Sequence, residues 1–179
     1  MNHGSPPFSL PTLNRLSAAD FIRHVGPVFE HSPWIAAAAW ELRPFASVET
    51  LHAALCAVVK NSGEEKQLAL LRAHPDLVGK LALAGQLTRE STGEQASAGL
   101  DQLTAHEVAH FQKNNADYQA KFGFPFIICA RLNKRAAILA GFERRLKNSR
   151  AEEMLAALAE VFLIAELRLR DLILPTARE

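Results

Sequence analysis

The helical character of this chain is clearest in one segment, which reads Thr104-Ala-His-Glu-Val-Ala-His-Phe-Gln-Lys-Asn-Asn-Ala-Asp-Tyr-Gln-Ala-Lys-Phe122. Thr104 and Glu107 have capping-box spacing, in which a threonine hydroxyl and a glutamate carboxylate bind each other's backbone amides at the start of a helix. The less polar residues then recur three and four apart, as one buried helix face requires: Val108, Phe111, Asn115, Tyr118 and Phe122. The solvated face would carry His106, His110, Lys113, Asp117 and Lys121.

Similar helix signals occur along the rest of the chain. Capping residues precede apolar helical patterns at Ser17-Ala-Ala-Asp20, Ser62-Gly-Glu-Glu65 and Ser149-Arg-Ala-Glu152. Pro75 predicts the end of a helix over residues 64–73, because a residue before proline avoids helical geometry. Strand-like alternation is missing. We therefore expect an all-α fold of about seven to nine helices, with a flexible tail over residues 1–9 and a single domain over residues 10–179.

Composition restricts the possible partners and the compartment. The 179 residues carry a formal net charge of +1, too little to steer the protein to nucleic acid or an anionic membrane. Two cysteines, Cys56 and Cys129, are too few for a disulfide framework and favour a reducing compartment. The first residues lack a signal-peptide pattern, and charged side chains interrupt the apolar segment 154–174. These features predict a cytoplasmic protein that binds neither nucleic acid nor membrane.

One motif has the form of a zinc site. His106-Glu-Val-Ala-His110 matches H-E-x-x-H, in which two histidines one helical turn apart hold zinc and the glutamate activates water. However, Glu107 also stands at a capping position, both histidines fall on the predicted solvated face, and no clear third ligand follows. We favour a surface helix without metal. A zinc-dependent hydrolase that uses His106, Glu107 and His110 remains an alternative, as does a helical binding module without catalysis.

A histidine stands at the predicted end of a helix in Leu71-Arg-Ala-His-Pro-Asp-Leu-Val-Gly-Lys80. The helix dipole at that position favours the protonated imidazolium of His74, which could donate a proton near neutral pH. Pro75 limits where the ring can point. From position alone, a histidine that merely caps the helix is the favoured interpretation.

Two further segments offer groups that could bind a ligand. In Ser91-Thr-Gly-Glu-Gln95 the capping-box spacing of Ser91 and Glu94 predicts a helix start, whose amides can bind an anion or a carbonyl. Glu94 and Gln95 together would suit a urea or a ring lactam, and we rate the structural and the binding interpretations equally. The run Phe122-Gly-Phe-Pro-Phe-Ile-Ile-Cys-Ala-Arg131 favours a buried core segment, although Gly123 and Pro125 predict irregular backbone with free amides.

Three further residues, one of them inside the apolar pattern near the end of the chain, complete the set of candidates. Arg131 and Arg168 each carry a planar guanidinium that could face a carboxylate. Cys129 has no obvious base partner, so we do not expect it to act as a nucleophile.

Four motifs in this order resemble one family. Glu30-His-Ser-Pro-Trp34, His74-Pro-Asp-Leu77, Ser91-Thr-Gly-Glu-Gln95 and Phe122 to Arg131 are similar to motifs of 2-oxo-4-hydroxy-4-carboxy-5-ureidoimidazoline (OHCU) decarboxylase, an enzyme of urate breakdown. Each motif alone is weak, but four at matching separations are specific. The resemblance covers residues from about 13 to about 174. It implies an all-helical fold, a small-molecule substrate, a homodimer, and no metal or organic cofactor.

The resemblance also assigns roles to residues. It implies that His74 is the proton donor, that Glu94 is the second essential side chain, and that the product is (S)-allantoin. The essential arginine matches Arg168, and Arg131 is the weaker candidate. The remaining residues are implied to contact substrate: Pro75, Ser91, Thr92, Gly93, Gln95, Phe126, Ile127, Ile128, Cys129 and Ala130. His106 and His110 match no family feature.

Overall fold

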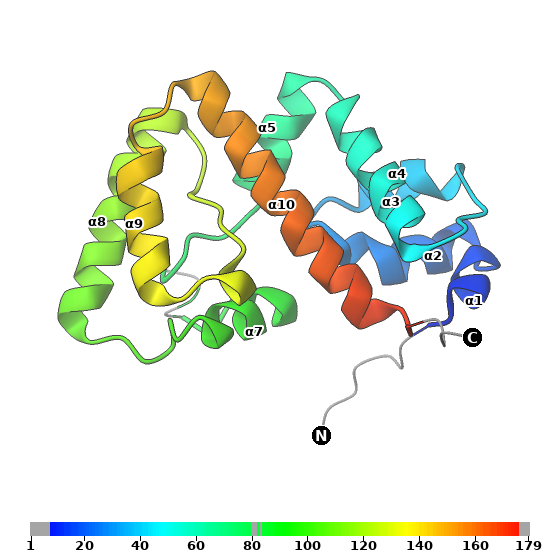
Figure 1. The fold of residues 1–179 in the computed structure, drawn as a ribbon, viewed down its shortest axis with the longest axis horizontal. Coiled ribbons are helices and arrows are strands. Elements are labelled where there is room, and N and C mark those ends of the chain that lie inside the picture. The colour runs from blue at the N-terminus through cyan, green and yellow to red at the C-terminus, as the bar shows by residue number, and fades with distance from the viewer. Residues whose placement is uncertain (1–7, 80–81, 83, 176–179) are drawn as a thin grey trace. The chain divides into compact units, whose positions relative to one another are not determined.

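The computed structural model describes residues 8–79, 82 and 84–175 (Figure 1). These residues form nine α-helices and two 3₁₀ helices. They contain no strand, only one isolated bridge between Phe8 and Ile173. The predicted all-α class is confirmed. Residues 1–7 of the expected tail lie outside the described residues, whereas the Phe8 amide donates to the Leu172 carbonyl at 2.8 Å and Ser9 caps the first helix.

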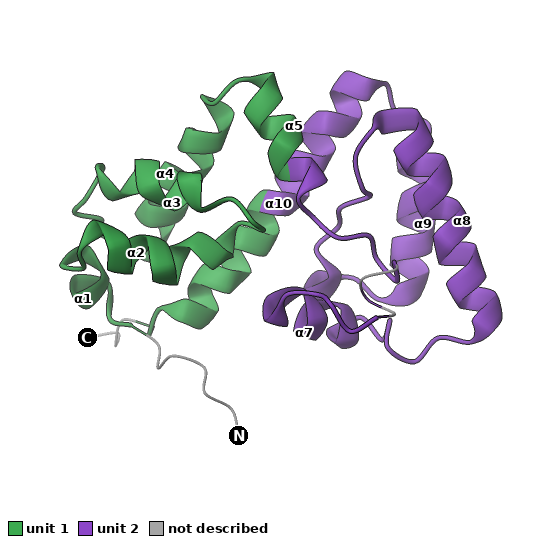
Figure 2. Cartoon of the chain, turned by 180° about the vertical axis from the view of Figure 1, so that it is seen from behind, with its two compact units in different colours: residues 1–70, 162–179 green, residues 71–161 purple. Residues whose placement is uncertain are grey.

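The described chain divides into two compact units (Figure 2). Unit 1 comprises residues up to 70 together with those from 162 onward, and unit 2 comprises residues 71–161. Helices α5 (Glu64–Arg72) and α10 (Arg150–Leu172) continue from one unit into the other. None of the helices in the described residues is long and apolar enough to span a membrane.

Unit 1 is built from the N-terminal helices and the end of α10. They are α1 (Leu10–Asn14), α2 (Ala18–Val25), η1 (Gly26–Val28), α3 (Pro33–Trp40) and α4 (Val48–Lys60). The Ser17 hydroxyl accepts from the Asp20 amide at 3.2 Å, which confirms the predicted cap of α2. Helix α3 packs against α2 and α4. The largest side chains buried there are Leu13, Phe21, Phe29, Ile35, Leu51 and Leu55.

Unit 2 is built on a pair of helices that run in the same direction. It contains α7 (Arg89–Ser97), α8 (Ala105–Phe122), η2 (Ala130–Leu132), α9 (Arg135–Arg145) and the start of α10. An ion pair of 2.9 Å between Glu107 Oε1 and Arg135 Nη1 joins the beginnings of α8 and α9. At their ends Lys121 Nζ donates to the Leu146 carbonyl at 2.6 Å. The chain between them therefore returns along the pair, as Figure 1 shows.

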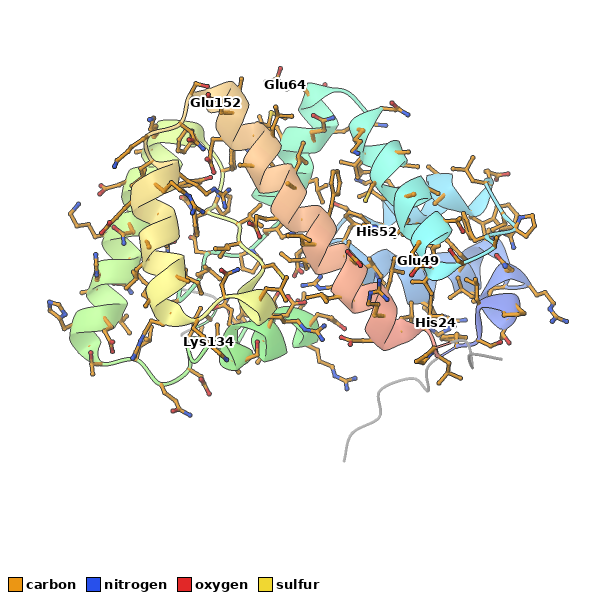
Figure 3. The ribbon with its side chains drawn as sticks, viewed as in Figure 1. His24, Glu49, His52, Glu64, Lys134 and Glu152 are labelled. Atoms are coloured by element: carbon orange, nitrogen blue, oxygen red, sulfur yellow. The ribbon has the colours of Figure 1, made fainter. Side chains whose placement is uncertain are left out.

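The predicted caps of α8 and α10 and the predicted faces of α8 are confirmed. Thr104 and Glu107 form the reciprocal capping box of α8, and Ser149 and Glu152 form another at the start of α10 (Glu152 is labelled in Figure 3). Phe111, Asn115, Tyr118 and Phe122 are buried, while His106, His110, Lys113, Asp117 and Lys121 are exposed. Gly123 ends α8 at φ 78°, a left-handed conformation that glycine adopts without strain.

Candidate active site

His74 lies directly beyond the end of α5. The helix ends at Arg72, one residue before the predicted end, and the His74 amide donates to the Leu71 carbonyl at 3.2 Å. The His74 side chain is only 8% exposed. The backbone after it is tight, because Val78 has φ 55°, which is rare for a β-branched residue. At Gly79 a Cβ atom would lie 2.6 Å from the Asp76 Cβ, so glycine is required there.

Side-chain amides from two helices hold the loop over residues 76–78. From α7, Gln95 Oε1 accepts from the Val78 amide at 3.0 Å and Gln95 Nε2 donates to the Asp76 carbonyl at 3.4 Å. From α8, Asn115 Nδ2 donates to the Leu77 carbonyl at 2.8 Å. Gln119 Nε2 donates to both carboxylate oxygens of Asp76, at 2.8 and 3.0 Å. The loop that follows His74 is thus fastened to the helix that carries Gln95.

Sequence reasoning missed the two residues from α8. The sequence does contain a signal for Asn115, because this residue places a polar amide on a helix face that is otherwise apolar. A buried amide needs a hydrogen-bond partner, so its position alone indicates a specific contact. Its partner, the Leu77 carbonyl, lies 38 residues earlier in the chain. The spacing of residues along the sequence does not reveal such a distant contact.

The predicted helix start at Ser91 is wrong. Helix α7 begins at Arg89, because Thr88 precedes it as the N-cap and accepts from the Ser91 amide at 3.3 Å. The Thr88 carbonyl also accepts from the Thr92 amide at 2.9 Å. The amides of Ser91 and Thr92 are therefore already bonded, and any contribution of this segment to binding must come from side chains.

Helix geometry separates the five residues of this segment into two groups. Ser91 and Gln95 are one turn apart and buried, with Glu94 half-buried beside them. Thr92 and Gly93 are exposed on the other side of the helix. The inner face of α7 therefore presents a hydroxyl, a carboxylate and a carboxamide, whereas Thr92 and Gly93 face solvent.

The segment over residues 126–130 has the predicted irregular backbone and is buried throughout. Arg145 Nη1 donates to the Ile127 carbonyl at 2.5 Å, and the Cys129 amide donates to Glu160 Oε2 at 2.8 Å. The Phe126 ring stacks on Phe142 of α9 at 3.9 Å between centroids. The N–H groups of Ile127 and Ile128 make no hydrogen bond to any described residue. Backbone donors of this kind are available to a ligand.

Helix α7 and this segment lie next to each other. Helix α7 packs against η2, and Lys134 Nζ donates to the Ser97 carbonyl at 2.8 Å (Lys134 is labelled in Figure 3). Burial raises the pKa of the Cys129 thiol, and the carboxylates of Glu160 and Glu94 raise it further. The thiol stays protonated, in agreement with the expectation that it is no nucleophile.

Unit 2 thus brings together three of the predicted segments: the His74 loop, the inner face of α7, and residues 126–130. Arg131 is exposed in η2. Arg168 belongs to unit 1, where Arg168 Nη1 donates to Glu30 Oε2 at 3.0 Å and to the Pro27 carbonyl at 3.2 Å. Glu30 is 2% exposed and begins the first of the four motifs. Its ion pair with Arg168 was not predicted, because 138 residues separate the two.

A buried charged network supports residues 126–130 from α9 and α10. Glu153 is fully buried, and its Oε1 accepts from Arg145 Nε at 2.7 Å and from the Tyr118 hydroxyl. Its Oε2 accepts from Asn148 Nδ2 at 2.7 Å. Burial raises the pKa of Tyr118, and the hydrogen bond to Glu153 raises it further, so the phenol remains a donor. The same Arg145 holds the Ile127 carbonyl, which links the network to the segment.

The zinc-like motif forms part of a capped surface helix. Glu107 Oε2 accepts from the Thr104 amide at 2.9 Å, and this bond is the main reason that the pKa of Glu107 is lowered. His106 and His110 are exposed. In the part of the chain that the structure describes, no three His, Cys, Asp or Glu side chains are grouped closely enough to hold a metal ion. The prediction that both histidines lie on the solvated face of this helix is confirmed.

Comparison with known proteins identifies the family. The family model for OHCU decarboxylase matches residues 14–170. The 2-oxo-4-hydroxy-4-carboxy-5-ureidoimidazoline decarboxylase of Haloferax volcanii is 43% identical, with 91% of this chain and 95% of that protein aligned. The enzyme of the same name from Amia calva is 42% identical, over 90% of this chain and 92% of that protein. A crystal structure of (S)-allantoin synthase superposes with a TM-score of 0.76 at 29% identity over 93% of this chain, which spans 54% of that chain. The chain therefore belongs to the OHCU decarboxylase family.

Proposed function

We propose that this chain catalyses the cofactor-independent decarboxylation of OHCU to (S)-allantoin in urate breakdown, with His74 as the proton donor. The observation that carries the proposal is the hydrogen bond of 3.0 Å between the Val78 amide and Gln95 Oε1. It fastens the loop after His74 to the helix whose inner face presents Ser91, Glu94 and Gln95. Two segments that sequence motifs single out independently are thereby joined.

The chemistry fits these residue types. When the carbon–carbon bond to the carboxylate breaks, carbon dioxide leaves and the electron pair stays on the ring carbon, delocalised into the neighbouring carbonyl or imine. A general acid then delivers a proton to that carbon, and its position relative to the ring decides which enantiomer forms. His74 supplies this proton. The Glu94 carboxylate accepts hydrogen bonds from the N–H groups of the ureido substituent and so orients the ring.

The substrate also needs backbone donors and a cationic group. The buried N–H groups of Ile127 and Ile128 suit ring carbonyl oxygens, and Pro75, Ser91, Gln95, Phe126, Cys129 and Ala130 provide the surrounding contacts. Thr92 and Gly93 are exposed on the other side of α7, so they serve the site by completing the helix that presents Ser91, Glu94 and Gln95. The family resemblance implies that Arg168 holds the substrate carboxylate, and in unit 1 its guanidinium is paired with the Glu30 carboxylate.

The stereochemistry of the product tests the function. Freshly oxidised urate, passed through the preceding hydrolysis step, is incubated with and without the purified protein, and the optical activity of allantoin is followed. Spontaneous decay gives racemic allantoin, so we expect an excess of the S enantiomer only with the protein. A racemic product at an unchanged rate would contradict the proposal.

The choice between the two arginines can be tested with lysine variants, which keep the charge but lose the planar fork. We expect Arg168→Lys to raise KM about tenfold or more, because charge-assisted hydrogen bonds contribute about 1.5–3 kcal/mol. Arg131→Lys, at an exposed position, is the matched control and should leave KM unchanged. The opposite result would transfer the role to Arg131.

The proposal includes the homodimer that the family resemblance implies and the cytoplasmic location that the sequence features predict. Both cysteines are free and buried, which suits a reducing compartment. Sedimentation velocity of the purified protein measures the assembly directly.

A further inference from the structure

Asn115 and Gln119 lie one turn apart on α8 and belong to none of the four motifs of the family. Asn115 is 5% exposed, on a face that otherwise carries Phe111, Tyr118 and Phe122. A carboxamide at such a position costs stability unless it is hydrogen-bonded. Its Nδ2 donates to the Leu77 carbonyl at 2.8 Å, whereas its Oδ1 has no hydrogen-bond partner within the described structure. Asn115 therefore contributes to the fold through its N–H donor and not through its carbonyl oxygen.

The loop that these two residues hold does not have the regular hydrogen bonds of a helix or strand. Residues 75–79 contain Val78 in a left-handed conformation, which persists only where the surroundings enforce it. Asn115 fixes the Leu77 carbonyl, and Gln119 fixes the Asp76 carboxylate through both oxygens. Together with Gln95 on α7, they bind three successive residues of the loop. We call Asn115 and Gln119 the α8 clamp.

The position of the loop relative to His74 gives the clamp a functional consequence. Pro75 joins His74 to the clamped residues and has a fixed φ, so little rotational freedom separates the imidazole from the point of attachment. Both clamp side chains are neutral amides, so they hold the loop without adding a charge of their own beside the proton donor. Displacement of a catalytic group by about 1 Å can cost up to about 100-fold in rate. Loss of the clamp would allow such a displacement.

We propose that Asn115 and Gln119 are positioning residues, which fix the direction from which His74 delivers its proton by holding the loop at residues 76–78. This inference rests on the proposed role of His74 as the donor. It predicts that the clamp contributes to kcat and to the enantiomeric excess of the product. Substrate binding, which uses other groups, should depend on it much less.

The test uses Asn115→Leu, which has a similar size but no N–H donor. We expect kcat to fall about tenfold or more, KM to change less than about twofold, and the enantiomeric excess of allantoin, extrapolated to high enzyme concentration, to fall. Enantiomeric excess is the decisive readout, because a variant that only lowers the folded fraction gives the same enantiomer from the molecules that remain folded. Asn114→Leu is the matched control: its side chain makes no hydrogen bond to a described residue, and we expect wild-type values.

Gln119→Leu provides a second variant at an exposed position, where folding is not at risk. We expect the same pattern with a smaller loss of kcat, about threefold. The inference would be overturned if this variant and a folded Asn115→Leu both showed wild-type kcat and enantiomeric excess. It would also be overturned if kcat fell while the enantiomeric excess stayed unchanged. If the wild-type protein itself gave racemic allantoin, the proposed function would fail instead, so the two failures are distinguishable.

Discussion

Replacement of His74 by asparagine is expected to lower kcat about 100- to 10,000-fold, the usual contribution of a positioned general acid. Asparagine keeps a hydrogen-bonding group of similar shape but has no proton to give to carbon. The buried groups on α7 and at residues 126–130 remain, so KM should change little. Initial rates at saturating substrate measure the effect, and a thermal melt verifies that the variant is folded.

The matched control for this prediction is His110→Asn. His110 lies on the exposed face of α8 in the same unit, so the same substitution there should leave kcat unchanged. Residual stereoselectivity in His74→Asn would show that the inner face of α7 and residues 126–130 still bind the ring in one orientation. A folded His74→Asn variant with the wild-type rate would remove the proton donor from the mechanism.

Local signals predicted the helices well because their causes are local. The capping box at Thr104 involves atoms three residues apart, and the buried face of α8 follows from a period that the sequence displays directly. The predicted start of α7 was wrong because Thr88 and Ser91 are both good N-cap residues, and residue spacing alone does not show which of them caps the helix. The difference matters, because it moves the binding groups of this segment from backbone amides to side chains.

The site itself was predictable as a set of segments but not as an arrangement. The motifs at His74, Ser91 and Phe126 could be found by resemblance, whereas the side-chain amides that hold the loop after His74 act across 17 to 43 residues. The left-handed Val78 has no sequence signal, since valine disfavours that conformation. Glu30 was visible as part of a motif, but its partner Arg168 follows only from the fold.

The buried network at Glu153 gives the largest stability effect we expect. Glu153→Leu leaves the Arg145 guanidinium buried without its carboxylate and deprives the Tyr118 hydroxyl and Asn148 of their acceptor. Removal of one partner from a buried ion pair costs about 3–5 kcal/mol, and we expect a loss of this size in the free energy of unfolding, measured by urea denaturation. Arg144→Met, at the exposed neighbouring position, is the control and should leave that free energy close to its wild-type value.

The double variant Arg145→Met/Glu153→Leu separates the structural role of this network from its functional one. Replacement of both charges by apolar groups of similar volume can be nearly neutral, so most of the stability lost in Glu153→Leu should return. Activity should not return with it, because Arg145 Nη1 also holds the Ile127 carbonyl at 2.5 Å and methionine has no donor for that bond. The segment at residues 126–130, whose amides we propose to contact the substrate, would then be folded but no longer fixed. Restored stability together with full activity would mean that Arg145 has no separate role in holding residues 126–130. Stability losses that simply added in the double variant would instead mean that Arg145 and Glu153 do not stabilise each other.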